Sequence, residues 1–335
     1  MASVTNGGAT RLSDRALSLL RCPQCRSSLD AGPSQVTCLG CKSVFPIEKG
    51  VIRIIQHMDS FYEGTYTRQI KYIPGRNGLM NWGFFHLVQA GVLGDLRRVL
   101  PRNGRVLDLG CAGGIRWLGQ TSETVGIDLS IASLVHAAEI YTVAIQAGVE
   151  SLPVADALFD VVYGSYFFEH LSAESKRRCL LEIGRTLRPG GACLLQFDTL
   201  ANNLLVRLAR SDPAAFQRGF IDKDSHLGLE PLSSNLLRIE EAGLRVERVV
   251  KFGTTLLQPL PTYQWLEIAY GEKYRWARVV GRLARGLAKH KKLWLPFESA
   301  VTLFDRLISP MVDGDRATRV IVAARRPGSR SGPNA

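Results

Sequence analysis

The sequence predicts an α/β protein: a seven-stranded, doubly wound sheet, preceded by a small cysteine-bearing unit and interrupted by a helical insert before its last strand. Three observations predict this. From Arg105 onward, short apolar segments alternate with helical ones, which is typical of a sheet covered by helices on both faces. Four cysteines form two pairs near the start of the chain. Residues 254–315, rich in Leu, Trp, Tyr and Arg, separate the last two predicted strands.

The composition fits a folded protein of about two domains. The chain has 335 residues, of which 46% are hydrophobic and 21% charged, enough to build a sizeable core. It has no apolar run of about 18 residues, and its first fourteen residues lack the apolar stretch of a secretory signal. The seven cysteines are an odd number, which fits a reducing compartment. We therefore expect a cytoplasmic protein without a transmembrane span.

The chain divides into four parts by composition. Residues 1–58 hold the cysteines and end in a strand-like run, and residues 59–103 are an aromatic, turn-rich connector with a predicted helix over 87–100 stopped by Pro101. Residues 104–326 carry the sheet pattern, and residues 327–335 read as a disordered tail. The predicted sheet strands are 105–109, 124–128, 143–146, 160–163, 191–197, 245–252 and 319–323.

The cysteine pairs have metal-binding spacing. Cys22-Pro-Gln-Cys25 and Cys38-Leu-Gly-Cys41 are separated by twelve residues, so four thiolates can surround one Zn²⁺. The alternative is four reduced, buried cysteines in a turn-rich region. With four protein ligands, no position is open for water, and we expect a structural zinc.

The segment from Leu20 to Cys41, with the ending Phe45-Pro-Ile…Gly-Val51, resembles the zinc ribbon of the small activator subunit that partners tRNA and protein methyltransferases. That subunit supports its catalytic partner structurally. The resemblance implies that the ribbon does the same here within one chain.

A second group of motifs lies where the predicted sheet begins. Val106 to Gly114 is an apolar strand that runs into a small-residue turn, and glycines there let a ligand approach the backbone. Alone, this turn could be an ordinary strand-to-helix connection. Asp128 ends the next strand eighteen positions after Gly110, where a carboxylate can accept both ribose hydroxyls of an adenosine.

Together with Glu150-Ser-Leu-Pro153, Phe168-Glu-His-Leu171 and Leu187-Arg-Pro-Gly-Gly191, these motifs resemble the class I S-adenosylmethionine-dependent methyltransferases. The similarity is greatest to the broad group that includes ubiquinone and menaquinone biosynthesis enzymes, and it covers about residues 100–252 and the last strand. It implies a Rossmann-like methyltransferase sheet, S-adenosylmethionine as cofactor, and a connector helix that caps the cofactor.

The resemblance also implies roles for single residues. The methionine part of the cofactor would be held by Asp108, Gly110, Cys111, Ala112, Gly113 and Gly114, and the ribose by Asp128. The adenine would lie along Leu129, Glu150, Ser151 and Leu152. The family usually has an acidic residue where this chain has Gly148, so a backbone carbonyl or Glu150 would have to contact the adenine amino group.

Methyl transfer needs alignment of donor and acceptor, and a proton acceptor when the acceptor atom is a hydroxyl oxygen. The candidates for that proton step are Glu169, His170 and His226; the alternative for each histidine is a structural role. Asp198 is a further groove residue or a helix cap. The segment after Tyr163 lacks the Asn/Asp-Pro-Pro-Tyr/Phe signature associated with methylation of exocyclic base amines.

The insert is strongly basic. The net charge of the chain is +12, and residues 271–335 hold fourteen Lys/Arg against five Asp/Glu. In residues 274–295 apolar and cationic side chains interleave at helical spacing, the pattern of an interfacial helix. The alternatives are a helix packed on its own domain with a solvated basic face, and a surface for RNA.

Our leading hypothesis is O-methylation of a small-molecule, glycan or lipid-linked biosynthetic intermediate. Peripheral membrane contact through 274–295 is one of the alternatives left open for the insert. The first competitor is an RNA methyltransferase, since zinc ribbons fused ahead of this fold occur in ribosomal RNA guanine methyltransferases. The second competitor is a non-catalytic partner protein that keeps the fold as a scaffold.

Overall fold

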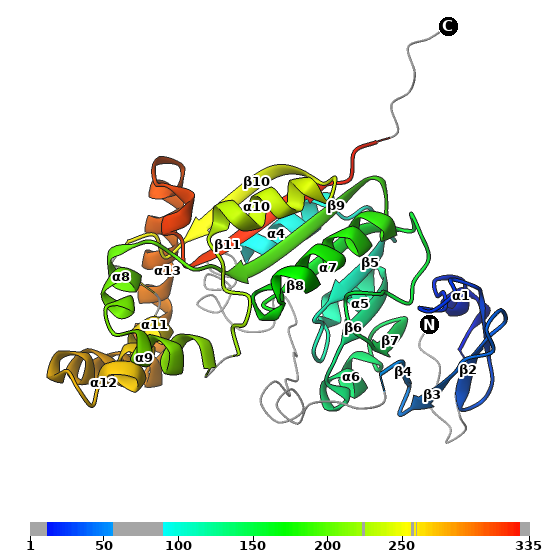
Figure 1. Ribbon diagram of the computed structural model, residues 1–335, viewed down its shortest axis with the longest axis horizontal. Coiled ribbons are helices and arrows are strands. Elements are labelled where there is room, and N and C mark those ends of the chain that lie inside the picture. Colours follow the sequence, from blue (N-terminus) through cyan, green and yellow to red (C-terminus); the bar gives the residue numbers. More distant parts are fainter. Residues whose placement is uncertain (1–11, 56–89, 223–224, 256–257, 259, 329–335) are drawn as a thin grey trace, which may run out of the picture.

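The computed structural model describes residues 12–55, 90–222, 225–255, 258 and 260–328 (Figure 1). Most of the predicted connector and the end of the tail lie outside these ranges. The described part of the predicted 87–100 helix is α4 (Ala90–Val99), which ends just before Pro101.

All seven predicted strands form and lie in one sheet. They are β5 (Arg105–Leu109), β6 (Glu123–Asp128), β7 (Val143–Gln146), β8 (Phe159–Ser165), β9 (Leu187–Asp198), β10 (Arg245–Phe252) and β11 (Arg319–Arg325). Their order is β7-β6-β5-β8-β9-β11-β10, and β11 runs antiparallel to both neighbours. The last strand therefore returns between β9 and β10 and makes the sheet mixed.

The predicted count of seven strands is wrong for the complete sheet, which has eleven. The cysteine unit adds β1 (Leu29–Ala31), β2 (Gln35–Cys38), β3 (Val44–Glu48) and β4 (Val51–Arg53) in an antiparallel meander. Strand β4 then pairs in parallel with β7, from Val51 opposite Ala144 to Arg53 opposite Gln146. A strand edge that is open in backbone hydrogen bonding attracts a partner, and β7 finds one in the ribbon.

Helices cover both faces of the sheet, as the sequence predicts. The side chains of each strand alternate between the two faces, so Leu107 belongs to one hydrophobic cluster and Val106 to the other. On one face the cluster includes α1 (Asp14–Ser18), α7 (Ala173–Thr186) and α10 (Leu232–Glu241). On the other face pack α4, α5 (Arg116–Thr121) and α6 (Ile131–Ala137).

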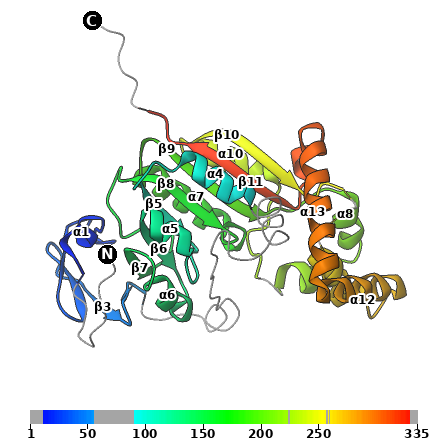
Figure 2. The ribbon, with the colours of Figure 1, turned by 180° about the vertical axis from the view of Figure 1, so that it is seen from behind.

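The insert is helical, as predicted, and consists of α11 (Leu260–Tyr270), α12 (Arg275–Lys289) and α13 (Lys291–Ile308). With α8 (Leu204–Arg210) and α9 (Pro213–Phe216) these helices form the end of the molecule opposite the ribbon (Figure 2). They have a separate small core that includes Leu205, Phe220, Leu266 and Ala277. Among the described helices, none combines the length and the apolar character needed to cross a bilayer.

Candidate functional site

The buried carboxyl group of Asp108 lies near the end of β5, beside β6. It is 2% exposed and accepts a hydrogen bond from the hydroxyl of Tyr141 at 2.6 Å. That hydroxyl in turn accepts from the backbone N–H of Ile115 at 2.7 Å. Burial raises the pKa of Asp108 to about 7, against the opposing hydrogen bond from Tyr141. Asp108 is thus a buried acid whose charge a cationic ligand would stabilise.

The turn after β5 holds Asp128 in place. The backbone N–H groups of Ala112 and Ser130 both donate to its carboxylate at 2.8 Å. Ala112 has a φ of 45°, a conformation that costs a non-glycine residue free energy and that occurs at ligand-binding turns. Gly110 (φ +64°) has no room for a side chain, because an added Cβ would lie 2.7 Å from the Cβ of Phe167. Cys111, Gly113 and Gly114 complete this turn and are buried.

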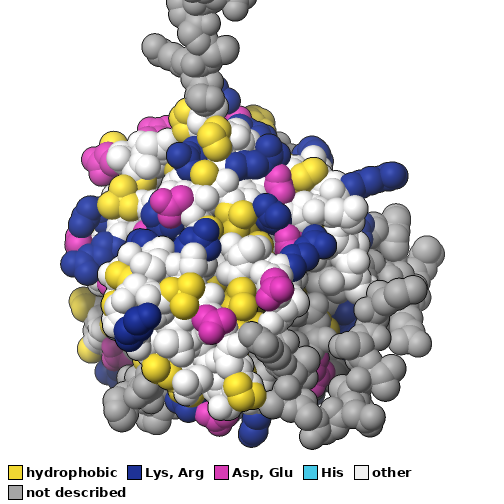
Figure 3. Space-filling view, turned by 90° about the vertical axis from the view of Figure 1, so that its right-hand side faces the viewer, with side chains coloured by type: hydrophobic (Ala, Val, Ile, Leu, Met, Phe, Trp, Pro, Cys, Tyr) yellow, Lys and Arg dark blue, Asp and Glu magenta, His cyan; other side chains and the backbone are white. Residues whose placement is uncertain are grey.

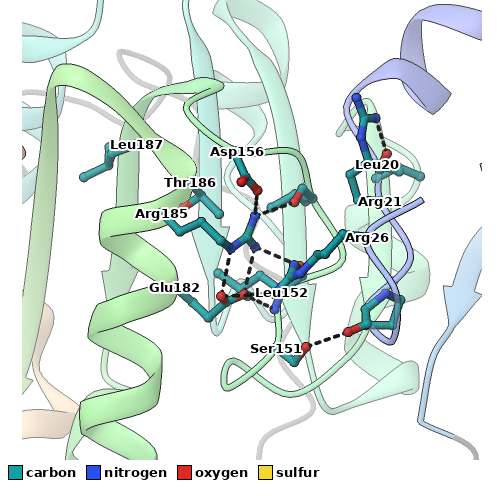
Figure 4. Close-up of polar contacts among 12 residues, drawn as sticks. Leu20, Arg21, Arg26, Ser151, Leu152, Asp156, Glu182, Arg185, Thr186 and Leu187 are labelled. Atoms are coloured by element: carbon teal, nitrogen blue, oxygen red, sulfur yellow. Dashed lines mark hydrogen bonds and ion pairs between the residues drawn. The ribbon is translucent and has the colours of Figure 1, made fainter. Parts of the chain in front are cut away.

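The four residues predicted to lie along the adenine fall into two groups: Leu129 contacts the sheet, whereas Glu150, Ser151 and Leu152 contact α7 or the ribbon. Leu129 directly follows Asp128, and its carbonyl accepts from the side-chain amide of Gln146 at 2.9 Å. Glu150 lies 3.7 Å from Arg178 on α7. The Ser151 hydroxyl donates to the carbonyl of Pro23 in the ribbon at 3.1 Å, and the backbone N–H of Leu152 donates to Glu182 at 2.7 Å (Figure 4). The polar groups of Glu150, Ser151 and Leu152 therefore bind α7 and the ribbon.

The three predicted proton-step residues lie together. Glu169 and His170 belong to a short 3₁₀ helix (Phe168–His170) that follows β8, and the rings of His170 and His226 are 5.2 Å apart between centroids. The backbone carbonyl of Glu169 accepts from the N–H of Gly228 at 2.9 Å, which fixes the two segments side by side. The ligand atoms of Glu169, His170 and His226 lie within 4.8 Å of one another. This cluster could hold a proton or a divalent cation.

Each imidazole is oriented by a backbone carbonyl. The Nδ1 atoms of His170 and His226 lie 3.0 Å from the carbonyl oxygens of Ser225 and Phe220. A carbonyl only accepts, so Nδ1 must carry the hydrogen in both rings. In the neutral form the lone pair is then on Nε2, the atom that can take a proton.

Glu169 differs from the histidines. It is 1% exposed, and one of its carboxyl oxygens has no hydrogen-bond partner among the described residues. Burial, reinforced by the negative charge of Asp198, raises the pKa of Glu169 well above its usual range. The raised pKa favours the protonated form of Glu169, which can donate a hydrogen bond to an acceptor molecule.

Sequence reasoning missed Tyr166, Gln196 and Arg319, which lie around Asp198 near the Glu169 cluster. We call Tyr166, Asp198 and Arg319 the Tyr166–Arg319–Asp198 wall. The guanidinium of Arg319, at the start of β11, donates to Asp198 at 3.2 Å and lies 5.0 Å above the ring of Tyr166. The side chain of Gln196 donates to the Tyr166 hydroxyl at 2.5 Å. Asp198 is no helix cap, since Asn203 caps α8. Only the position of Arg319 at the start of a predicted strand pointed toward this edge.

The four ribbon cysteines fit a tetrahedral Zn²⁺. The sulfur atoms of Cys22 and Cys41 are 3.6 Å apart, and those of Cys25 and Cys38 are 3.3 Å apart. Four thiolates at zinc bond length are separated by about 3.8 Å. Hydrogen bonds from Ser27 lower the pKa of Cys25 to about 5, whereas burial raises the pKa of Cys22 to about 12. The Cys25 thiolate that a metal requires is therefore favoured without the metal, and the Cys22 thiolate would need the metal charge to form.

The turns of the ribbon are also built for this arrangement. The residue after each cysteine pair, Arg26 and Lys42, has a φ of 64°. Gly40 cannot carry a side chain, because an added Cβ would lie 2.3 Å from the hydroxyl oxygen of Ser27. The donor set and the backbone therefore match the predicted zinc site.

An ionic network centred on the buried carboxylate of Glu182 attaches the ribbon to the rest of the sheet (Figure 4). Arg26 contacts both carboxylate oxygens of Glu182 at 3.1 Å and donates to the carbonyl of Leu152 at 2.8 Å. Arg185 also pairs with Glu182, at 2.8 Å, and with Asp156. Burial by itself raises the pKa of Glu182, but the hydrogen bonds from Arg185 and the Leu152 N–H outweigh it and lower that pKa.

Comparison with known proteins identifies the class of domain. Residues 107–195 match the family described as "Methyltransferase domain", and they contain the glycine turn, Asp128 and the Glu169-His170 pair. The chain thus carries a class I S-adenosylmethionine-dependent methyltransferase domain.

The curated relatives give a more particular similarity. The chain is 35% identical over 158 residues to the malonyl-[acyl-carrier protein] O-methyltransferase of Enterobacter lignolyticus (strain SCF1), covering 44% of this chain and 56% of the relative. The corresponding protein of Pseudescherichia vulneris is 32% identical over 125 residues, with 35% and 47% covered. The chain therefore spans about half the length of the curated relatives it matches.

Among solved structures, the chain is similar to a Haemonchus contortus phosphoethanolamine N-methyltransferase 2 in complex with S-adenosyl-L-methionine. The identity is 16% and the TM-score 0.46, with 85% of this chain and 62% of that chain covered.

Proposed function

We propose that this protein transfers a methyl group from S-adenosylmethionine to an oxygen atom of a small-molecule, glycan or lipid-linked biosynthetic intermediate. The observation that carries the proposal is the cluster of Glu169, His170 and His226 beside the glycine turn. Phe167, which precedes this cluster in the chain, lies against Gly110. The O-methyltransferase names of the curated relatives support oxygen as the acceptor atom.

Asp108, the turn after β5 and Asp128 form what we call the cofactor edge. Their side chains suit the positive charges and the ribose hydroxyls of S-adenosylmethionine. When bound, S-adenosylmethionine supplies the methyl group on an activated sulfonium. Asp108 would stabilise the cationic methionine part, and Asp128, held by Ala112 and Ser130, would accept the ribose hydroxyls. Leu129 would pack on the adenine. Ser151 and Leu152 would act indirectly, since their polar groups hold the loop after β7 against the ribbon.

The acceptor site would hold and deprotonate a hydroxyl group. The Nε2 atom of His170 or His226 accepts its proton, while the backbone carbonyls at Nδ1 keep each ring in the required tautomer. Glu169 and the Tyr166–Arg319–Asp198 wall provide the donors and acceptors that position the rest of the acceptor molecule.

The ribbon would support catalysis without touching the reacting atoms. We propose that residues 1–58 form a zinc-ribbon domain and residues 104–326 the methyltransferase domain that it supports. The network of Arg26, Glu182 and Arg185 connects the two through the loop that follows β7.

The first test concerns cofactor binding. We expect Asp128→Ala to abolish S-adenosylmethionine binding in calorimetry, because the ribose hydroxyls lose their carboxylate. Unchanged binding by this variant would refute the cofactor assignment.

The second test concerns the proton step. The protein is incubated with methyl-labelled S-adenosylmethionine and an extract of its source cells, and label is counted in separated lipid, small-molecule and RNA fractions. We expect label in lipid or small molecules, and a loss of about a hundredfold in rate for the variant that lacks the base, His170→Ala or His226→Ala. His136→Ala on α6 is the matched control. Wild-type rates in both histidine variants, or label in RNA alone, would contradict the proposal.

A further inference from the structure

Helix α12 packs on its own domain through small residues. Ala277, Gly281 and Ala284 are buried and face α11. The approach is close: a Cβ added to Gly281 would lie 2.2 Å from the Cβ of Glu267 on α11. The fully buried contacts of α12 are therefore made by small residues and not by its large apolar side chains, of which Val280 and Leu287 are half-buried.

The other large apolar side chains of α12 point into solvent. Trp276, Val279 and Leu283 are 50%, 56% and 66% exposed. Their spacing of three and four residues places them in one stripe along the helix. Exposed side chains of this size in a continuous stripe mark a surface that meets another apolar phase.

A cationic stripe runs beside the apolar one. Arg275, Arg282 and Lys289 are exposed and seven residues apart, so they lie on one side of the helix. The helix contains no acidic residue. Arg282 lies 3.9 Å from Glu267, while Arg275 and Lys289 make no ion pair with any described residue.

The position of α12 leaves this surface open. The helix lies at the outer end of the insert, away from the sheet, in both ribbon views (Figures 1 and 2). The opposite end of the molecule looks different: Figure 3 shows acidic and basic side chains interspersed there, with only scattered apolar ones. The face shown in Figure 3 thus lacks the separate apolar and cationic stripes of α12.

We propose that α12 binds an anionic lipid bilayer, lying in the plane of its surface. Trp276, Val279 and Leu283 enter the boundary between headgroups and acyl chains, and Arg275, Arg282 and Lys289 contact the anionic headgroups. The apolar stripe favours lipid over nucleic acid, because phosphate binding needs cations but no exposed aliphatic side chains.

The location of the acceptor site suggests why the protein would bind a bilayer. This part of the inference alone rests on the proposed function. Helix α11 lies between α12 and the histidine cluster, with the ring of its Trp265 6.0 Å from the ring of His226. A helix with side chains is about 10 Å thick. The bilayer surface would then lie two helix diameters, about 20 Å, from the acceptor cluster. The acceptor is therefore a molecule whose lipid part stays in the bilayer while its hydroxyl group extends about this far from the surface.

Vesicle co-sedimentation tests the binding without cofactor or acceptor. The full chain is mixed with vesicles of phosphatidylcholine, alone or with about 30 mol% phosphatidylglycerol, at low and high salt. We expect binding to the anionic vesicles only, weakened by salt. The double variant Trp276→Ser/Leu283→Ser should lose binding, and Arg275→Gln/Lys289→Gln should bind about tenfold more weakly at low salt.

A matched control uses the same chemistry on other helices. Leu181 on α7 and Leu237 on α10 are also exposed, and the double variant Leu181→Ser/Leu237→Ser should bind like the wild type. The proposal is overturned if the wild type ignores anionic vesicles or if Trp276→Ser/Leu283→Ser still binds them. The proposal is also overturned if the protein does not bind vesicles and α12 mediates dimerisation or binding to duplex RNA. Lipid labelling without vesicle binding would spare the proposed function and refute only this inference.

Discussion

The ribbon and the helical insert are both additions to the methyltransferase sheet, but they are attached in opposite ways. The ribbon continues the backbone ladder through β4 and β7, shares the main hydrophobic cluster, and is held by the Arg26–Glu182–Arg185 network. The insert has a small core of its own and leaves the largest side chains of α12 exposed. This difference is the basis for proposing that the ribbon stabilises the protein and that the exposed surface of α12 binds a partner.

Among the changes that test this comparison, removing the proposed zinc should alter the stability of the protein most. We expect Cys38→Ser, at a fully buried ligand, to release the metal and lower the melting temperature by about 10 °C, because structural zinc contributes several kcal/mol to folding. Metal analysis and thermal unfolding measure both effects. A chelated wild-type protein that regains its melting temperature with Zn²⁺ is the control. An unchanged melting temperature in the metal-free protein would show that the metal-bound ribbon does not stabilise the rest of the protein.

Breaking the ionic network around Glu182 should have the next largest effect. Glu182→Ala removes the shared partner of the half-buried Arg26 and Arg185, and the loss of these charged hydrogen bonds should cost about 2 kcal/mol of unfolding free energy. The matched control is Glu174→Ala on the same helix, whose pairs with Arg177 and Arg178 are exposed and should contribute much less to stability. Equal losses in chemical denaturation would contradict the assigned role of the network.

The cofactor edge should show a pH dependence set by Asp108. Its pKa of about 7 means that the carboxyl group is protonated in the unliganded protein at lower pH. A cationic ligand favours the ionised form, so binding should release a proton below pH 7, and affinity should fall up to tenfold per unit as the pH drops. Above pH 7 it should level off. Calorimetry in buffers of different ionisation enthalpy measures this release, and Asp108→Asn should bind weakly without the pH slope.

The smallest change in stability is expected for a substitution on the exposed side of α12. Leu283→Ser should change the free energy of unfolding by less than about 0.5 kcal/mol, since the side chain is already in water. Gly281→Val, on the buried side of the same helix, should destabilise the protein clearly because it would collide with Glu267. A large loss for Leu283→Ser in thermal unfolding would mean that this side chain packs on the protein itself.

The sequence by itself determined the elements and the chemistry that depend on local order. The seven strands follow from short apolar runs, the cysteine cluster proposed to bind zinc from two Cys-x-x-Cys pairs, and the proposed cofactor turn with Asp128 from a strand, a glycine-rich turn and a second strand. These patterns are readable because strand period, knuckle spacing and turn glycines are constraints between residues close in the chain.

Only the tertiary structure decided which distant residues meet. It joined the ribbon to β7, turned Ser151 and Leu152 toward that ribbon, and brought Arg319 beside Asp198 and Tyr166. It also showed that α12 packs through Ala277, Gly281 and Ala284 while its apolar stripe stays exposed. A helical pattern gives the faces of a helix but not which face is covered, because burial depends on the approach of segments far apart in the chain.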